Sequence, residues 1–334
     1  MPAAVPNFDV VAIGNAIVDV IARADDGFIA EQGMSKGSMR LIDDETADRL
    51  YAAMGAGLEM SGGSAANTLA GLAQLGARCG FIGQVADDQL GEVFAHDIRA
   101  SHIAFTTEAR PGEPATARCL ILVTPDAQRT MNTFLGASQF LPATALDADM
   151  IADAAILYLE GYLWDPAQPR AAMRRAIGIA KDNGRKVAFT LSDAFVIDRH
   201  RDDFLALIAE GAIDILFANE AEIISLQQTD DFEAAVATTA RGVPCLVVTR
   251  SERGAIAIVD GKRSEVPSEP IDQVVDTTGA GDLFAAGFLA GLSQQRDTIS
   301  CLTMGAICAR EIISHVGARS QVDLKALVAD RLNS

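Results

Sequence analysis

Residues 276–290 read DTTGAGDLFAAGFLA, a turn of small residues followed at once by an apolar run. The apolar run predicts a helix, so the turn stands at the amino-terminal end of that helix, where backbone N–H groups have no helical partner. Glycine lets the backbone approach a ligand closely, and the helix dipole favours negative charge at this end. The segment therefore predicts an anion site formed by Gly279, Ala280 and Gly281.

Two acidic residues flank this turn, Asp276 before the glycines and Asp282 after them. A carboxylate in the first turn of a helix is kept ionised by the dipole and can accept the proton of a hydroxyl group. Phosphoryl transfer needs little beyond positioning and charge stabilisation, so a modest base such as Asp282 suffices. Small residues and aspartate also cap helices for structural reasons alone, and both interpretations stay open at this point. Packing requires neither acid, which favours a site.

The rest of the chain predicts an α/β fold. Short apolar runs that suit strands buried on both faces occur at 8–14, 80–83, 155–159, 187–191, 213–218 and 245–249. Helical patterns lie between them, at 64–75, 169–183 and 201–210. This alternation predicts a central, mostly parallel sheet covered by helices, with a ligand site at the carboxyl ends of its strands.

Two regions interrupt the alternation. Strand-like pieces occur at 18–22, 38–42, 117–123 and 129–134, and a Pro125-Asp126 turn separates the last two. Turn chemistry of this kind is typical of hairpins, and it predicts a small antiparallel sheet that serves as a lid. The predicted division is a large domain of residues 1–14, 43–115 and 136–334, and a small β lid of residues 15–42 and 116–135.

Composition limits the partners. The chain has 334 residues, 49% of them hydrophobic, and a formal net charge of −18. An acidic surface repels nucleic acids and anionic membranes, so neither is an expected partner. The five cysteines have no metal-binding spacing, which favours a reducing cytoplasm over a disulfide framework. No apolar run reaches the roughly 18 residues that a membrane span needs, and residues 1–8 lack the pattern of a signal peptide.

With these features in place, the chain resembles the ribokinase-like (PfkB) carbohydrate kinase family over essentially its whole length. Residues 276–282 match the carboxyl-terminal signature of that family in full. Other segments are similar to its remaining motifs in the right order: Gly14-Asn15 with Asp19, 61–67 (SGGSAAN), 81–91 (FIGQVADDQLG) and 219–222 (NEAE). Several separate motifs in order are more specific than any one of them.

The resemblance implies a ribokinase-like three-layer α/β sandwich with a β lid, and a kinase that uses ATP and Mg²⁺. It implies that Asp282 is the catalytic base and that Gly279, Ala280 and Gly281 form the anion hole. Asn219 and Glu222 would order Mg²⁺ through water, although Asn219 also suits a helix cap. The residues expected to contact ATP are Asn219, Thr249, Gly254, Thr278, Gly279 and Gly281. Near Thr249, however, Ser251 stands where the family has a glycine. A monovalent cation such as K⁺ would lie near Asp276 and Thr278.

The acceptor is a hydroxyl compound whose class the motifs alone leave open. Polar residues and glycines expected to bind its ring hydroxyls are Asn15, Asp19, Gly62, Gly63, Ser64 and Asn67. Within the family, the chain is most similar to the adenosine kinases. By that likeness an apolar base pocket would contain Leu41, Met131, Thr133 and Leu135, Tyr162 would stack on a purine, and Arg129 would approach phosphate oxygens.

Each of these assignments has an alternative. Leu41, Met131 and Leu135 also suit the core of the lid, Tyr162 suits ordinary packing, and the polar Thr133 weakens the nucleoside interpretation. The first expectation is therefore a cytoplasmic adenosine kinase, and the second is a sugar kinase for ribose, fructose or a related sugar. A nucleotide-binding sensor without turnover is the third, and the intact Asp282 and anion turn disfavour it. Monomer and homodimer are both compatible with the sequence.

Overall fold

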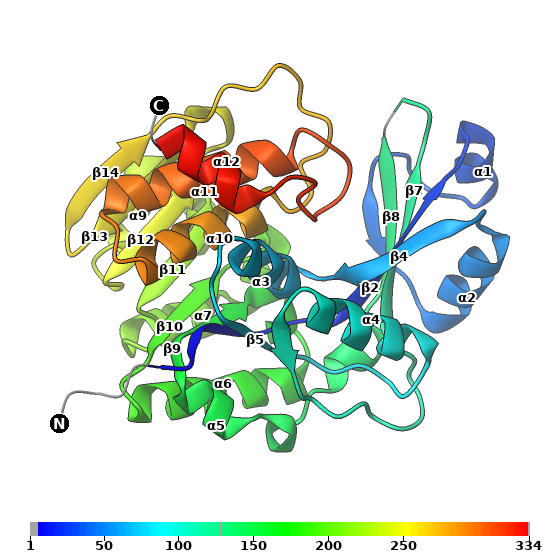
Figure 1. Cartoon of the computed structure of the whole chain (residues 1–334), viewed down its shortest axis with the longest axis horizontal. Helices are drawn as coiled ribbons and strands as arrows, with labels where there is room; N and C mark the ends of the chain where they lie inside the picture. The colour runs from blue at the N-terminus through cyan, green and yellow to red at the C-terminus, as the bar shows by residue number, and fades with distance from the viewer. Residues whose placement is uncertain (1–5, 127, 333–334) are drawn as a thin grey trace.

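A large sheet forms the centre of the molecule (Figure 1). The structure, a computed structural model, describes residues 6–126 and 128–332. Within these residues nine strands lie in the order β14-β13-β12-β11-β10-β9-β1-β5-β6, parallel from β12 to β6 and antiparallel at β13 and β14. The strands are β1 (Phe8–Ile13), β5 (Cys79–Ile82), β6 (Ile103–Phe105), β9 (Ala154–Glu160), β10 (Lys186–Thr190), β11 (Ile215–Asn219), β12 (Cys245–Thr249), β13 (Ala255–Val259) and β14 (Lys262–Val266).

Helices cover both faces of this sheet (Figure 1). Val10 and Ala12 of β1 belong to one buried cluster, whereas Val11 and Ile13 belong to another on the opposite face. The first cluster includes α3 (Ser64–Gln74), α4 (Gln89–Ala100), α10 (Ala280–Ser293), α11 (Thr298–Ile312) and α12 (Leu324–Leu332). The second includes α5 (Ala148–Ala152), α6 (Ala167–Asp182), α7 (Ala194–Ala209), α8 (Glu220–Gln227) and α9 (Phe232–Thr239). This arrangement confirms the α/β fold predicted from the apolar runs and the three-layer sandwich implied by the family resemblance.

One helix begins well before its predicted start. The sequence predicts a helix at 201–210, whereas α7 begins at Ala194, after the side chain of Asp193 caps the N–H of Phe195. His200 has a non-helical conformation, with φ −127° and ψ 20°. This kink interrupts the helical periodicity, so only the second half of α7 is visible in the sequence.

The second, five-stranded sheet has the order β3-β8-β7-β2-β4. Its strands are β2 (Ile17–Arg23), β3 (Met39–Leu41), β4 (Gly57–Gly62), β7 (Ala117–Val123) and β8 (Arg129–Phe134). The predicted antiparallel pairing is confirmed for the hairpin of β7 and β8, and β2 and β4 are also antiparallel. The sheet as a whole is mixed, because β2 pairs with β7 and β3 pairs with β8 in parallel. The strand β4 lies in a segment that the sequence assigned to the large domain. Its residues, GLEMSG, have little β propensity, which explains why it was missed.

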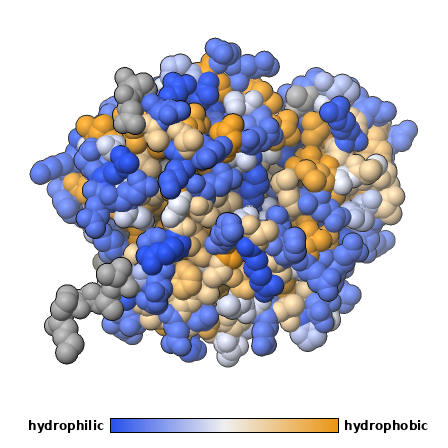
Figure 2. Space-filling view, in the orientation of Figure 1, coloured by the Kyte–Doolittle hydropathy of each residue, from blue (hydrophilic) through white to orange (hydrophobic). Residues whose placement is uncertain are grey.

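The two faces of the second sheet differ. On one face Val18, Val20, Leu120 and Leu122 join the core with α1 (Asp26–Glu31) and α2 (Asp44–Ala53). The other face carries polar and half-exposed residues, described below. Figure 2 shows hydrophobic patches within a mostly hydrophilic surface, some of them over the region of the second sheet. The exposed large apolar side chains on strands of this sheet are Met39, Leu41 and Leu58.

The described residues contain no membrane-spanning helix, disulfide bond or cluster of metal-binding side chains. None of the helices within 6–126 and 128–332 has the length and apolar character to cross a membrane. The five cysteines are buried free thiols. Across the same ranges, no group of three or more histidine, cysteine, aspartate or glutamate residues is arranged to hold a metal ion.

Candidate active site

Asp282 lies where the amino-terminal ends of α3 and α10 meet. Ser64 Oγ donates to Asp282 Oδ1 at 2.6 Å, and Asn67 Nδ2 donates to Asp282 Oδ2 at 3.2 Å. The two helices approach closely because small residues line their contact: a Cβ added to Gly71 would lie 2.8 Å from the Cβ of Ala286. The structure therefore brings the predicted base together with two predicted acceptor-binding residues.

The turn before Asp282 has the expected form of an anion site. Gly279 has φ 77°, a left-handed conformation that favours glycine, and a Cβ there would also press on Ala318 at 3.0 Å. The N–H of Ala280 bonds the carbonyl of Thr277, whereas the N–H groups of Gly281 and Asp282 belong to the first helical turn, which offers them no helical partner. Gly281 is exposed and faces open space. Room and donors thus coincide beside Asp282.

Two carboxylates share this region, and their surroundings set their protonation. Burial raises the pKa of Asp282, while the hydrogen bonds from Ser64 and Asn67 and the charge of Arg319 oppose that rise. Burial also raises the pKa of Asp19, to about 6, against the opposing charges of Arg319 and Arg129. The negative charge of Asp282 adds to this rise in the pKa of Asp19, so each carboxylate makes the other harder to ionise.

Asp19 belongs to a row of residues that crosses the second sheet. In the strand register Asp19 pairs with Cys119, Cys119 with Thr133, and Thr133 with Leu41. Paired residues point to the same face of a sheet, as do alternate residues along one strand. Arg129 and Met131 therefore share this face with Thr133. Leu41 is 54% exposed, and Met131 and Thr133 are half-buried, so these side chains are not the closed core of the second sheet.

Three other residues predicted to bind the acceptor differ in their burial and in their neighbours. Leu135 follows β8 and is half-buried, at the start of the 3₁₀ helix Gly136–Phe140. Tyr162, in the 3₁₀ helix Gly161–Trp164, lies 6.4 Å from the ring of Phe195. Burial raises the pKa of Tyr162. Asn15 is only 3% exposed. Stacking by Tyr162 and acceptor binding by Asn15 and Leu135 stay predictions.

The glycine pair before α3 is explained by close packing against β2 and the residues before it. A Cβ added to Gly62 would lie 2.4 Å from Asp19 Oδ2. Gly63 has φ 97°, and a Cβ there would lie 2.3 Å from the carbonyl oxygen of Asn15. The glycines thus allow the start of α3 to approach Asp19 of β2 and the backbone at Asn15.

A buried carboxylate that the sequence did not predict, Glu160, holds these parts together. Glu160 Oε1 accepts from the N–H and from Nδ2 of Asn15, and Glu160 Oε2 accepts from the N–H of Ala65, all at 2.7 Å. Ser138 Oγ in turn donates to Asn15 Oδ1 at 2.8 Å. Burial raises the pKa of Glu160 to about 7, although the three N–H donors oppose that rise. A single charged residue that ends an apolar strand was the available signal.

An ion pair links the second sheet to the anion turn. Arg129 Nη1 donates to Asp276 Oδ2, and both side chains are 6% exposed. Asp276 also accepts the N–H groups of Thr278 and Gly317, each at 3.0 Å. Arg129 Nε is buried and has no hydrogen-bond partner in the described part of the chain. The guanidinium thus lies at the anion turn, and the carboxylate expected to hold a monovalent cation is paired with it.

The predicted nucleotide residues lie at the carboxyl ends of neighbouring strands. Asn219 of β11 and Thr249 of β12 are partners in the strand register. Asn219 and Glu222 form a capping box, with Nδ2 of Asn219 donating to Glu222 Oε1 at 2.7 Å. Burial raises the pKa of Glu222 to about 7. Gly254 has φ 82°, and a Cβ there would meet the carbonyl of Val266 at 2.0 Å, so the backbone alone explains this glycine.

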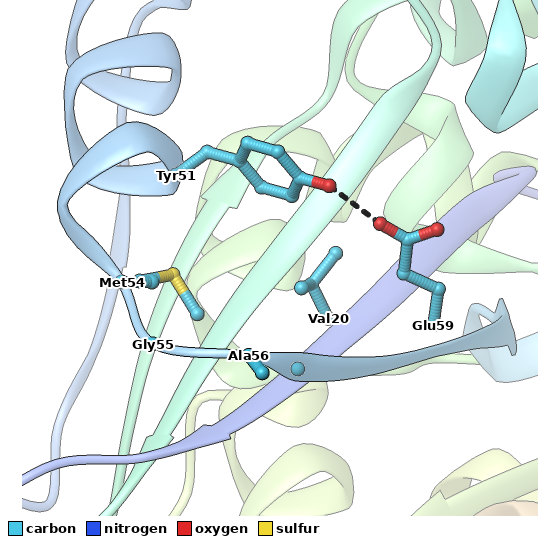
Figure 3. Close-up of a pocket in the computed structure, with 7 residues that line it drawn as sticks. Val20, Tyr51, Met54, Gly55, Ala56 and Glu59 are labelled. Atoms are coloured by element: carbon cyan, nitrogen blue, oxygen red, sulfur yellow. Dashed lines mark hydrogen bonds between the residues drawn. The ribbon is translucent and has the colours of Figure 1, made fainter.

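A separate hollow lies on the second sheet, away from these residues (Figure 3). It has a volume of about 230 Å³ and is bounded by Val20, β4 and the end of α2. Tyr51 Oη donates to Glu59 Oε1 at 2.6 Å across it. The hollow contains no residue of the predicted site.

The chain is similar to known proteins over nearly its whole length. The model of the pfkB family carbohydrate kinase matches residues 8–325. The crystal structure of adenosine kinase from Sinorhizobium meliloti is 46% identical, with a TM-score of 0.89, and the match covers 98% of this chain and 99% of that one.

A second solved structure and a curated relative are also similar to the chain over nearly its whole length. The crystal structure of a probable sugar kinase protein from Rhizobium etli is 45% identical, with a TM-score of 0.90 and the same coverage of 98% and 99%. Adenosine kinase from Saccharomyces cerevisiae is 26% identical over 327 residues, which cover 92% of this chain and 95% of the relative.

Proposed function

The chain belongs to the pfkB family of carbohydrate kinases, and from that premise we propose that its acceptor is adenosine. Members of this family are phosphotransferases in which ATP is the phosphoryl donor and an alcohol group is the acceptor. The proposed reaction transfers the γ-phosphoryl group of ATP to the hydroxymethyl oxygen of adenosine, giving AMP and ADP.

One observation carries this proposal: the face of the second sheet that bears Asp19 continues into apolar side chains. Asp19, Thr133 and Leu41 lie in one row, and Met131 lies beside them. A carboxylate suits the vicinal hydroxyls of ribose, and apolar side chains next to it suit a flat purine ring. A free sugar has no base attached to its ring, so Leu41 and Met131 would have no apolar group to contact. The 46% identical adenosine kinase supports the same acceptor.

The residues at the anion turn fit the phosphates of ATP. The open space at Gly281 leaves room for a phosphate group. The N–H groups of the first turn of α10 and the unpartnered Nε of Arg129 supply hydrogen-bond donors and positive charge for it. Mg²⁺ usually needs only one or two carboxylates besides phosphate and water. Glu222 and Asn219, beside Thr249, are the residues that would order its water shell. When bound, Mg²⁺ neutralises charge on the phosphate oxygens.

The chain's own residues then account for the transfer. Asp282 accepts the proton of the acceptor hydroxyl, and Ser64 and Asn67 hold its carboxylate in place for that transfer. The free N–H groups of Gly281 and Asp282 donate to the phosphoryl oxygens as charge develops on them, while Gly279 and Ala280, whose N–H bonds the carbonyl oxygen of Thr277, give the turn its shape. Arg129 lies close enough to this turn to assist, provided that it exchanges Asp276 for a phosphate oxygen. Asp276 and Thr278 would then be free to hold a monovalent cation such as K⁺.

A sugar kinase is the second candidate, because the acceptor end of the site is rich in buried polar groups. Asn15, Ser138 and Glu160 form a hydrogen-bonded cluster next to the glycine pair, and small sugars are bound by such clusters. The probable sugar kinase from Rhizobium etli supports this candidate. It uses the same anion turn and the same base, so only the acceptor distinguishes the two proposals.

The test is a comparison of acceptors. ATP consumption is measured with Mg²⁺, with and without K⁺, for adenosine, other nucleosides, ribose and fructose at several concentrations of each. A kcat/KM for adenosine at least tenfold above that for every sugar is expected, since an apolar base contact of a few groups contributes about 1–3 kcal/mol. A higher kcat/KM for a free sugar would overturn the adenosine proposal and favour the second candidate.

A further inference from the structure

Three consecutive residues after α11 each contact a different part of the site. The N–H of Gly317 donates to Asp276 Oδ2 at 3.0 Å. Ala318 packs against Gly279 of the anion turn. Arg319 reaches across to the other side, where its Nη1 donates to the carbonyl oxygen of Ala66 at 2.8 Å. The segment 317–319 therefore joins the anion turn to the glycine pair before α3.

Arg319 holds the glycine-rich segment at both ends. Besides Ala66, it bonds Ser61, with Nη2 donating to the carbonyl oxygen at 2.8 Å and to Oγ at 2.9 Å. Between these two anchor points lie Gly62, Gly63, Ser64 and Ala65, and Ser64 is a donor to Asp282. A planar guanidinium can bridge two such carbonyl groups, whereas the ammonium of lysine acts from a single point.

Ser61 is itself fixed from the opposite side. Asp97 Oδ2 accepts both the N–H and the Oγ–H of Ser61, at 2.7 and 2.6 Å. Burial lowers the pKa of Arg319, whereas the charges of Asp97, Asp19 and Asp282 raise it. Arg319 thus has a negative partner on each side of the glycine pair.

From this geometry we propose that Arg319 is a positioning residue of the acceptor site, which holds segment 61–67, with Ser64 and Asn67, against the anion turn and Asp282. The proposal rests on the proposed kinase function but not on the identity of the acceptor. Two carboxylates that face one hydroxyl compound repel each other, and Asp282 acts as a base only when ionised. The charge of Arg319 opposes the rise in pKa of both Asp282 and Asp19.

Several other ionisable groups face Asp282 and act on the same proton equilibrium. Asp19 approaches from β2 and Glu160 from the end of β9, and two buried tyrosines lie nearby, Tyr158 and Tyr162. Of the charges that act on Asp282 itself, Arg319 is the one that lowers its pKa. Its removal should therefore raise the pKa of Asp282, and the acidic limb of the activity profile should move to higher pH.

The experiment compares Arg319→Gln and Arg319→Lys with the wild-type enzyme, using the acceptor that the wild type prefers. In Arg319→Gln the acidic limb of kcat/KM should move up by about one pH unit, and KM for the acceptor should rise about tenfold. KM for ATP should stay within about twofold, because Arg319 anchors the acceptor side. Arg319→Lys keeps the positive charge, so the acidic limb should return to the wild-type midpoint. KM for the acceptor should stay raised, because one ammonium group cannot bridge Ser61 and Ala66.

The matched control is Arg310→Gln, which also removes a guanidinium that donates to a backbone carbonyl, that of Pro270. It should leave the pH profile and both KM values unchanged. Activity is normalised at each pH to the folded fraction measured by the fluorescence of Trp164, because acid unfolding of a destabilised variant would also move the limb to higher pH. The proposal would be overturned if the acidic limb of kcat/KM in Arg319→Gln kept the wild-type midpoint, or if KM rose equally for ATP and for the acceptor. Failure of the wild type to use any acceptor would instead refute the kinase function.

Discussion

Replacement of Glu160 by glutamine should destabilise the protein most at acidic pH. Glu160 is fully buried and accepts three N–H groups at 2.7 Å, two from Asn15 and one from Ala65. Burial favours the neutral carboxyl group and the three donors favour the carboxylate. The net result is a pKa raised to about 7, so burial is the larger effect.

The sign of the effect follows from proton binding. The unfolded chain releases the proton of Glu160 near the ordinary glutamate pKa of 4.5, and the folded protein keeps it until about pH 7. Between these values the folded state binds more protons, so the unfolding free energy of the wild type falls as pH rises, by about 1.4 kcal/mol per pH unit. The whole window corresponds to roughly 3 kcal/mol. Glu160→Gln has no group that titrates there and lacks this slope.

The amide of the variant also changes a contact. Its NH₂ group must face either Ala65 or Asn15, both of which present N–H donors to this position, and an unsatisfied buried donor costs about 1–3 kcal/mol. The variant should therefore be about 1–3 kcal/mol less stable than the wild type near pH 5. The difference should shrink or change sign by pH 8, because only the wild type loses stability across the window.

Urea unfolding at pH 5, 6, 7 and 8 measures this difference, and the only tryptophan, Trp164, is fully buried and reports on unfolding by its fluorescence. Glu31→Gln, at an exposed position, controls for the loss of one carboxyl group. A stability difference that is constant with pH, or that grows as pH rises, would refute the reasoning. It would mean that the three N–H donors outweigh burial and that Glu160 is ionised throughout.

Three further predictions concern the site. Asp282→Asn should lower kcat by about 10²–10⁴-fold and leave ATP affinity within about twofold, as measured by turnover and calorimetry; near-wild-type turnover would exclude Asp282 as the base. Arg129→Met should cost about 3–5 kcal/mol of unfolding free energy, because it leaves Asp276 buried without its partner. Adding Asp276→Asn should recover part of that loss in urea unfolding, and strictly additive losses would argue against a coupled pair. Met131→Ala should raise KM for adenosine about tenfold without affecting slow turnover of ribose, and equal effects on both would return Met131 and Leu41 to structural packing.

The sequence predicted those parts of the molecule whose signals are local. The apolar runs of the large sheet, the turn at 276–282 and the strands of the hairpin around Pro125 each depend on residues close together in the chain. The position of Asp282 in the first turn of α10 followed from the same local pattern. These features were predictable because glycine turns and apolar periodicity determine backbone structure directly.

The features that the sequence missed depend on contacts between distant segments. Arg319 bonds Ala66 across 253 positions of the chain, and Glu160 bonds Asn15 across 145. Nothing around Arg319 marks it as different from a surface arginine. The strand β4 forms although its residues have little β propensity, because β2 offers it a partner edge. Contacts between segments far apart in the chain, rather than any local pattern, therefore complete the site.

The most direct test of the central proposal is a competition in one reaction mixture. Wild-type enzyme and Asp282→Asn each receive ATP, Mg²⁺, K⁺ and equal concentrations of adenosine and ribose, and the phosphorylated products are identified by mass. The expected result is AMP as the main product of the wild type, and at least about 100-fold less of it from the variant. Ribose phosphate as the main product would contradict the choice of adenosine, and AMP formed by the variant at the wild-type rate would contradict the role of Asp282.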